Sequence, residues 1–188
     1  MTTAPTSTAT ETAETLTIWD RFVRVFHWSV ATLFLLDFWV LEDGDPPHEW
    51  AGYAIGVLLI LRIIWGFIGP YNARFTSFFP TPARVSHHLR ALQQRQFDHR
   101  EGHNPVGGAM VITLMLMLAV ATLSGWMQTW DMFWGEDWVE ELHETSAELG
   151  MILVTVHVAA VVIMGRITGI PLIHTMLTGK RHIKQEQP

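Results

Sequence analysis

Four long apolar stretches constrain the fold of this chain more than any other feature of its sequence. They cover residues 23–41, 50–68, 106–129 and 149–169. Each has about the length of 20 residues that a helix needs to cross a hydrocarbon core about 30 Å thick. The charged fraction of 16% is also below the roughly 25% of typical soluble proteins. The 188 residues therefore predict one all-α domain, an integral membrane bundle of four helices.

Cations and acids fall on opposite sides of this predicted bundle. Of the 12 Lys and Arg residues, all but Arg62 lie at or before the start of the first stretch, between the second and third, or at or beyond the end of the fourth. These are Arg21, Arg24, Arg74, Arg84, Arg90, Arg95, Arg100, Arg166, Lys180, Arg181 and Lys184. The other two connections carry acids instead: Glu42, Asp43, Asp45, Asp131, Glu136, Asp137, Glu140 and Glu141. Short cytoplasmic loops are enriched in Lys and Arg, so we expect cytoplasmic N- and C-termini in the bacterial inner membrane.

The segments outside the apolar stretches predict tails and surface elements. The expected divisions are a disordered tail at 1–17, the membrane domain at 18–182 and a C-terminal tail at 183–188. The first of these is rich in Thr, Ala, Ser and Glu and lacks an apolar core. Thr81 and Pro82 are typical of a helix start and predict a short amphipathic helix on the membrane surface. Aromatic and acidic residues in 129–142 predict an interfacial segment at the outer end of the bundle.

Composition limits the chemistry and the partners. The chain has no cysteine, which excludes disulfides, iron–sulfur clusters and thioether-linked heme. Any heme must therefore be held non-covalently. The net charge of −6 reflects acids and bases that are separated onto two sides of a membrane, and nothing in it supports a nucleic acid as partner.

Four histidines define two levels in the predicted bundle. His143 and His157 are 14 residues apart, so on one helix their side chains leave nearly the same face about 21 Å apart along the axis. His48 marks the outer start of the second stretch, and His27 lies near the cytoplasmic start of the first. Pairing by depth joins His48 with His143 and His27 with His157. Two facing imidazoles can fill both axial positions of a heme iron, so the two levels predict two hemes.

A less specific interpretation is open for each histidine alone. His27, His48 and His143 are each compatible with an interfacial position, and His157 with a bond to a backbone carbonyl. Polar groups inside membrane spans usually face the bundle interior and have a function, and four at two matched levels favour the hemes. His103 is a weaker candidate for contact with a propionate or a quinone. We expect the others to be solvated: His87, His88, His99, His174 and His182.

Arg62, Arg24 and Gly52 are further candidate cofactor contacts. Arg62 follows His48 by 14 residues, which places it at the depth of the inner pair, where a guanidinium can bind a heme propionate bidentately. Alternatively, its side chain extends to the cytoplasmic interface. Arg24 is likewise either a propionate contact or a cationic anchor at that interface. Gly52 permits close approach of either a porphyrin or a helix. Asp37 is unexpected near the outer level, where it could tune the outer heme, relay protons to a quinone or face water.

Six short motifs, in order along the chain, resemble one family. They are WDRFVRVFHW at 19–28, HEWAGY at 48–53, RIIWGFIG at 62–69, GHNPVG at 102–107, LHE at 142–144 and TGKR at 178–181. The chain after residue 17 is similar to the bacterial cytochrome b-561 and nickel–iron hydrogenase cytochrome b subunit family. This resemblance implies a four-helix membrane cytochrome with two b-type hemes ligated by His27, His48, His143 and His157. It also implies electron transfer between the quinone pool and a redox partner.

Three functions of different class follow as hypotheses. The first is an electron relay between ubiquinone and a c-type cytochrome or another respiratory enzyme. The second is a quinone-coupled oxidoreductase that acts directly on a small substrate, similar to a superoxide oxidase. The third is a heme-free membrane scaffold or transporter. Acidic outer connections suit a basic partner such as a cationic cytochrome c, whereas guiding an anion to the outer heme would need cations there, so the sequence favours the relay.

Overall fold

The structure is a computed structural model that describes residues 13–94, 102 and 104–184. Its four long helices are α1 (Arg21–Trp39), α2 (Pro46–Ile68), α5 (Pro105–Gln128) and α6 (Asp137–Thr168). The shorter elements are β1 (Ala13–Thr17), η1 (Tyr71–Ala73), α3 (Phe75–Phe78), α4 (Pro82–Gln93), α7 (Leu172–Thr178) and β2 (Lys180–Lys184). All four long helices are long and apolar enough to cross a membrane. The predicted all-α membrane bundle is thus confirmed.

Local sequence signals explain where the long helices begin. Asp20 caps α1 by accepting a hydrogen bond from the Val23 backbone N–H at 3.0 Å. Asn104 caps α5 in the same way through the Gly107 N–H at 2.7 Å, and a proline follows directly. Helix α6 begins at Asp137, earlier than the apolar stretch from residue 149 predicts. Acids in its first turn favour this extension because they complement the positive end of the helix dipole.

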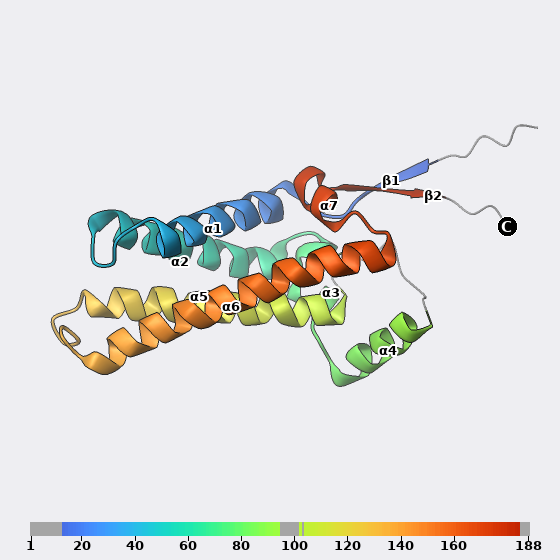
Figure 1. The fold of residues 1–188 in the computed structure, drawn as a ribbon. Helices are drawn as coiled ribbons and strands as arrows, with labels where there is room; N and C mark the ends of the chain where they lie inside the picture. The colour runs from blue at the N-terminus through green and yellow to red at the C-terminus, as the bar shows by residue number, and fades with distance from the viewer. Residues whose placement is uncertain (1–12, 95–101, 103, 185–188) are drawn as a thin grey trace, which may run out of the picture.

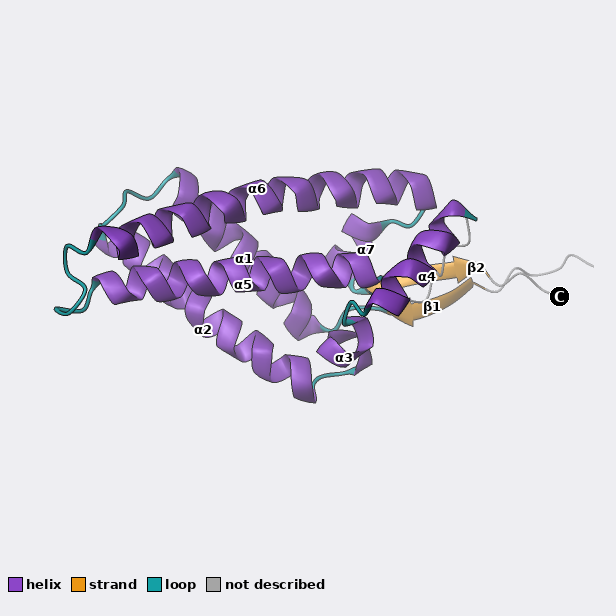
Figure 2. Cartoon of the chain, turned by 90° about the horizontal axis from the view of Figure 1, so that it is seen from below, coloured by secondary structure: helices purple, strands orange, loops and turns teal. Residues whose placement is uncertain are grey.

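The four long helices run side by side along a common direction (Figures 1 and 2). Close backbone packing joins α1 to α2, α2 to α5 and α5 to α6, whereas α6 stands off from α1 and α2. The α1–α2 and α5–α6 connections lie at one end of the bundle, and β1, β2 and α7 lie at the other (Figure 1). Both acidic connections therefore share an end, as the charge pattern requires. Which end faces the cytoplasm stays a prediction.

The outside of the bundle is apolar and its interior holds a small aromatic and aliphatic core. Phe34, Ile55 and Leu59 are buried together between the helices. Large apolar side chains are exposed along all four long helices, including Leu36, Trp39, Val57, Ile60, Ile64, Leu116, Leu123, Ile152, Val156 and Ile163. An exposed apolar surface of this extent is stable in lipid and unstable in water. The surface thus matches a protein surrounded by hydrocarbon.

Two segments far apart in the sequence, one at each end of the described chain, pair with each other, which the sequence did not predict. Residues 13–17, assigned from sequence to a disordered tail, form β1 and pair antiparallel with β2, with Thr17 opposite Lys180. The Ile18 N–H donates to the Gly179 carbonyl at 2.8 Å, and Gly179 has a φ of 79°, which favours glycine. The remainder of the predicted tail, residues 1–12, and residues 185–188 of the C-terminal one lie outside the described chain. Helix α4 begins at Pro82 as predicted.

Candidate functional site

The structure brings the four predicted histidines together as two pairs. His27 of α1 faces His157 of α6, with ring centroids 6.3 Å apart and an interplanar angle of 53°. His48 of α2 faces His143 of α6, with centroids 5.8 Å apart and an angle of 83°. We call the first the inner pair and the second, at the end of the acidic connections, the outer pair. His143 and His157 lie within one unbroken helix, α6, as the prediction from their 14-residue interval requires.

The spacing of both pairs fits an iron porphyrin. Two imidazole nitrogens each about 2 Å from one metal ion place their ring centroids about 6 Å apart. Helix α6 also stands off from α1 and α2, the helices that supply the opposite ligands. Within the described residues no three His, Cys, Asp or Glu side chains gather around one point. Each pair instead offers two imidazole nitrogens. A porphyrin iron can take two ligands from the protein, one on each side of the ring.

His143 is the most firmly oriented of the four side chains. Its Nδ1 lies 2.8 Å from the carbonyl oxygen of Ala121 on α5, and because a carbonyl can only accept, Nδ1 must donate. A neutral imidazole with its proton on Nδ1 leaves Nε2 free as a metal ligand. Gly125 makes room for the ring, since a Cβ there would lie 2.9 Å from His143 Cε1. Helix α5 thus contributes no ligand but fixes the tautomer of one.

His48 has a partner that the sequence did not predict. Its Nδ1 lies 3.0 Å from Asp37 Oδ1 on α1 and 3.8 Å from Asp43 Oδ1 in the α1–α2 connection. The Asp37 carboxylate is 15% exposed, whereas that of Asp43 is 94% exposed. Asp37 was the unexplained carboxylate of α1, and the structure places it beside an outer-pair imidazole. In the inner pair, His27 Nδ1 is buried without a hydrogen-bond partner in the described chain.

Arg62 is buried next to the segment that follows α2. Only 2% of the residue is exposed, so snorkelling to the interface does not describe its position. One guanidinium nitrogen, Nη2, donates to the Ala73 carbonyl at 3.1 Å, and the guanidinium carbon lies 5.1 Å from the Phe75 ring centroid. The other nitrogen, Nη1, is buried with no hydrogen-bond partner among the described residues. Binding of a heme propionate by Arg62 stays a prediction that this nitrogen permits.

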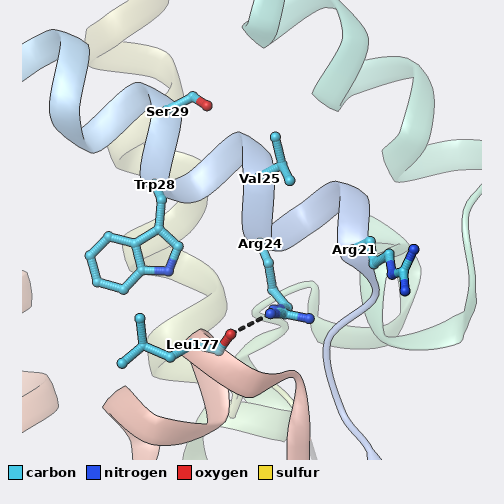
Figure 3. A pocket seen from close by; sticks show the side chains of 6 residues that line it. All are labelled: Arg21, Arg24, Val25, Trp28, Ser29 and Leu177. Carbon is cyan, nitrogen blue, oxygen red and sulfur yellow. Dashed lines mark hydrogen bonds between the residues drawn. The ribbon is translucent and has the colours of Figure 1, made fainter.

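Arg24 lines a pocket of about 460 Å³ at the inner end of the bundle (Figure 3). Its guanidinium donates to the Leu177 carbonyl of α7, and Trp28 lies beside it in the same pocket. The contact with α7 shows that Arg24 holds the C-terminal segment against α1. Gly52 faces open space, because a Cβ there would meet no atom within 4 Å. Helix packing therefore does not explain this glycine, and its predicted contact with a porphyrin is untested.

The remaining histidines lie apart from both pairs where the structure describes them. His87 on α4 and His174 on α7 are exposed. His182 of β2 lies 2.9 Å from the Thr15 hydroxyl of β1 through its Nδ1. His99 and His103 lie outside the described residues, so the weaker prediction for His103 stays open.

An apolar layer separates the two pairs. Phe34 of α1 reaches Gly150, midway along α6 between His143 and His157, where its Cζ lies 3.4 Å from the position of an added Cβ. Phe34 is buried with Ile55 and Leu59 of α2. An apolar core therefore lies between the two pairs.

A four-helix membrane bundle with paired imidazoles facing each other across its interior is the architecture of a membrane cytochrome. The family model of prokaryotic cytochrome b561 matches residues 18–179, and the chain belongs to this family. The match begins and ends at the two residues joined by the Ile18–Gly179 backbone hydrogen bond. No curated protein and no solved structure matches the chain. Family and fold together indicate a multi-pass membrane protein that transfers electrons through b-type heme.

Proposed function

We propose that this protein carries electrons across a membrane through two b-type hemes, one held by His27 and His157 and the other by His48 and His143. The proposal rests on two pairs of imidazoles that face each other between α6 and the helices opposite it. Their ring centroids are 6.3 Å apart in the inner pair and 5.8 Å apart in the outer pair. Both pairs include one residue of α6, whose helical rise fixes their separation along the bundle.

The protein residues bind and shield the cofactors. A b-type heme with both axial positions filled supplies one-electron transfer and offers no open position to oxygen or substrate. The four imidazoles would hold the two hemes, and the Ala121 carbonyl keeps the His143 ring in one tautomer. Phe34 and its apolar neighbours exclude water from the space between the sites. Arg62 Nη1, which has no hydrogen-bond partner among the described residues, would bind a propionate of the inner heme.

The proposed exchange partners are the quinone pool and a redox protein such as a c-type cytochrome or a respiratory enzyme. The bundle end next to the outer pair bears the acids of both connections, among them Glu42, Asp43, Asp131 and Glu136, all exposed. Such a surface attracts a basic protein and slows the approach of a small anion. This charge supports a relay over direct oxidation of an anionic substrate such as superoxide. We place the protein in the bacterial inner membrane with this end outward.

The proposal is tested by counting hemes in the purified protein. A pyridine hemochrome assay, with a reduced-minus-oxidised spectrum, should give two heme b per chain. His157→Ala removes a ligand of the inner pair alone, so we expect about one heme to remain, with the spectrum of the outer site. His48→Ala should leave the complementary spectrum.

The matched control is His174→Ala, which removes an exposed imidazole outside both pairs and should retain two hemes. A wild-type protein without heme would overturn the proposal. If His157→Ala retained two hemes with unchanged spectra, the assignment of the inner pair would be wrong.

A further inference from the structure

Asp37 and His48 form a contact that the heme-ligand assignment leaves unused. Oδ1 of the carboxylate and Nδ1 of the imidazole lie 3.0 Å apart, and their side chains are only 15% and 19% exposed. Neither atom has a partner with full hydrogen-bond geometry in the described chain. Two polar atoms that are buried at this separation and otherwise unpartnered stabilise the protein when they bond to each other and destabilise it when they do not.

The chemistry of the two groups sets the direction of the bond. A carboxylate accepts, so the imidazole must carry its proton on Nδ1, and Nε2 is then left as the ligand nitrogen. Nδ1 lies within hydrogen-bond distance of Oδ1, so the bond requires a change in direction and not in distance. A contact between a metal-ligating histidine and a carboxylate orients the ring and makes the ligand nitrogen more basic.

We propose that Asp37 is a positioning residue of the outer heme site, which holds the His48 imidazole in the ligating tautomer and lowers the midpoint potential of the outer heme. The inference rests on the proposed function, since it requires a heme at the outer pair. A negative carboxylate beside one axial ligand stabilises the oxidised, more positive state of the site over the reduced one.

The Asp37 carboxylate lowers the midpoint potential of the outer heme and not that of the inner heme. In the outer pair one ligand contacts a carboxylate and the other, His143, donates to a neutral carbonyl. In the inner pair, the Nδ1 of His27 has no hydrogen-bond partner in the described chain. Asp37 therefore makes the two sites electronically unequal, and this inequality biases the direction of electron flow between them.

Redox titration of purified Asp37→Asn with both hemes bound tests this inference. Asparagine keeps an acceptor oxygen of similar size and removes the charge. We expect the reduction equilibrium constant of the outer heme to rise about tenfold, which is a positive shift of about 59 mV for one electron, while that of the inner heme is unchanged. The low-spin electron paramagnetic resonance signal of the outer heme should shift as well. The His48→Ala protein, which lacks the outer heme, assigns the two components.

Asp43→Asn is the matched control. It removes a carboxylate near the same imidazole, but one at 3.8 Å and 94% exposed, where solvent screens its charge. We expect it to leave both potentials unchanged. If Asp37→Asn lost the outer heme, its return in Asp37→Glu, but not in Asp37→Leu, would support the positioning role.

Two outcomes would overturn the inference. One is an outer-heme potential and resonance signal in Asp37→Asn equal to those of the wild type. The other is an equal shift in Asp43→Asn, which would show only a general effect of surface charge. Failure of the proposed function itself is distinguishable, because the wild-type protein would then contain no heme at the outer pair.

Discussion

At the residue scale, each histidine of the outer pair lies beside a polar atom of a helix other than its own. His143 donates to the Ala121 carbonyl and fits beside Gly125 only because that residue has no Cβ. We predict that Gly125→Ala weakens outer-heme binding by about 1 kcal/mol, roughly fivefold, since the added carbon must displace the ring and disturb one hydrogen bond. Titration of the apoprotein with heme, followed by the spectrum of each site, measures this change.

Gly56→Ala provides the comparison within the same bundle. A Cβ on Gly56 would meet its nearest atom, Thr122 Cβ, at 4.0 Å, which is ordinary contact. The substitution should leave heme affinity at both sites within experimental error. Equal weakening by both substitutions would contradict a specific role for Gly125.

The pairing of the four histidines by depth was predictable from sequence, but the polar atoms beside them were not. Depth in a membrane helix follows from residue spacing, so His143 and His157 could be assigned to two levels by counting. The Ala121 carbonyl carries no sequence signal, because every residue has one. Asp37 stood out as a polar residue, but its contact with His48 depends on how α1 and α2 are rotated about their axes. That rotation is set by packing across the whole bundle.

At the scale of elements, α6 fixes the distance and the relative rotation between His143 of the outer pair and His157 of the inner pair. One added residue between His143 and His157 rotates one imidazole by about 100° relative to the other and moves it by about 1.5 Å. We predict that insertion of a single alanine after Leu153 reduces the heme content from two to one per chain. Circular dichroism should show unchanged helicity, and the pyridine hemochrome assay gives the count.

An alanine inserted after Asp137 serves as the control for the extra residue. It lies before both histidines in the first turn of α6, so the α5–α6 connection can absorb it and the interval between the ligands is kept. This variant should retain two hemes. If the variant with the insertion after Leu153 also retained two hemes, α6 would not fix the relative positions of the two sites.

The existence of the long helices was predictable, whereas some of their boundaries were not. An apolar run of about 20 residues indicates a spanning helix almost without regard to context. The extension of α6 back to Asp137 has no apolar signal, because it depends on first-turn acids and on packing of Val139, which is fully buried. Strand β1 was missed for a different reason. Its partner Lys180–Lys184 is remote in sequence, and the Ala-Glu-Thr-Leu-Thr segment alone resembles an unstructured tail.

At the scale of the whole molecule, charge and topology agree. The fold gathers both acidic connections at one end and the β1–β2 pair with its cations at the other (Figure 1). Lys and Arg are retained on the cytoplasmic side when helices insert. The same charge asymmetry places an acidic surface beside the outer pair. The orientation therefore decides on which side of the membrane the proposed basic redox partner would bind.

The predicted orientation can be measured on this chain, because its 188 residues contain no cysteine and one can be introduced at a time. Asp131→Cys replaces an exposed residue of the α5–α6 connection, and His174→Cys replaces an exposed residue of α7 at the opposite end. A membrane-impermeant maleimide added to intact cells with a permeabilised outer membrane should label the first cysteine. It should label the second only after the inner membrane is opened, and never the cysteine-free parent. The reverse pattern would place the outer pair, and any partner that docks there, on the cytoplasmic side.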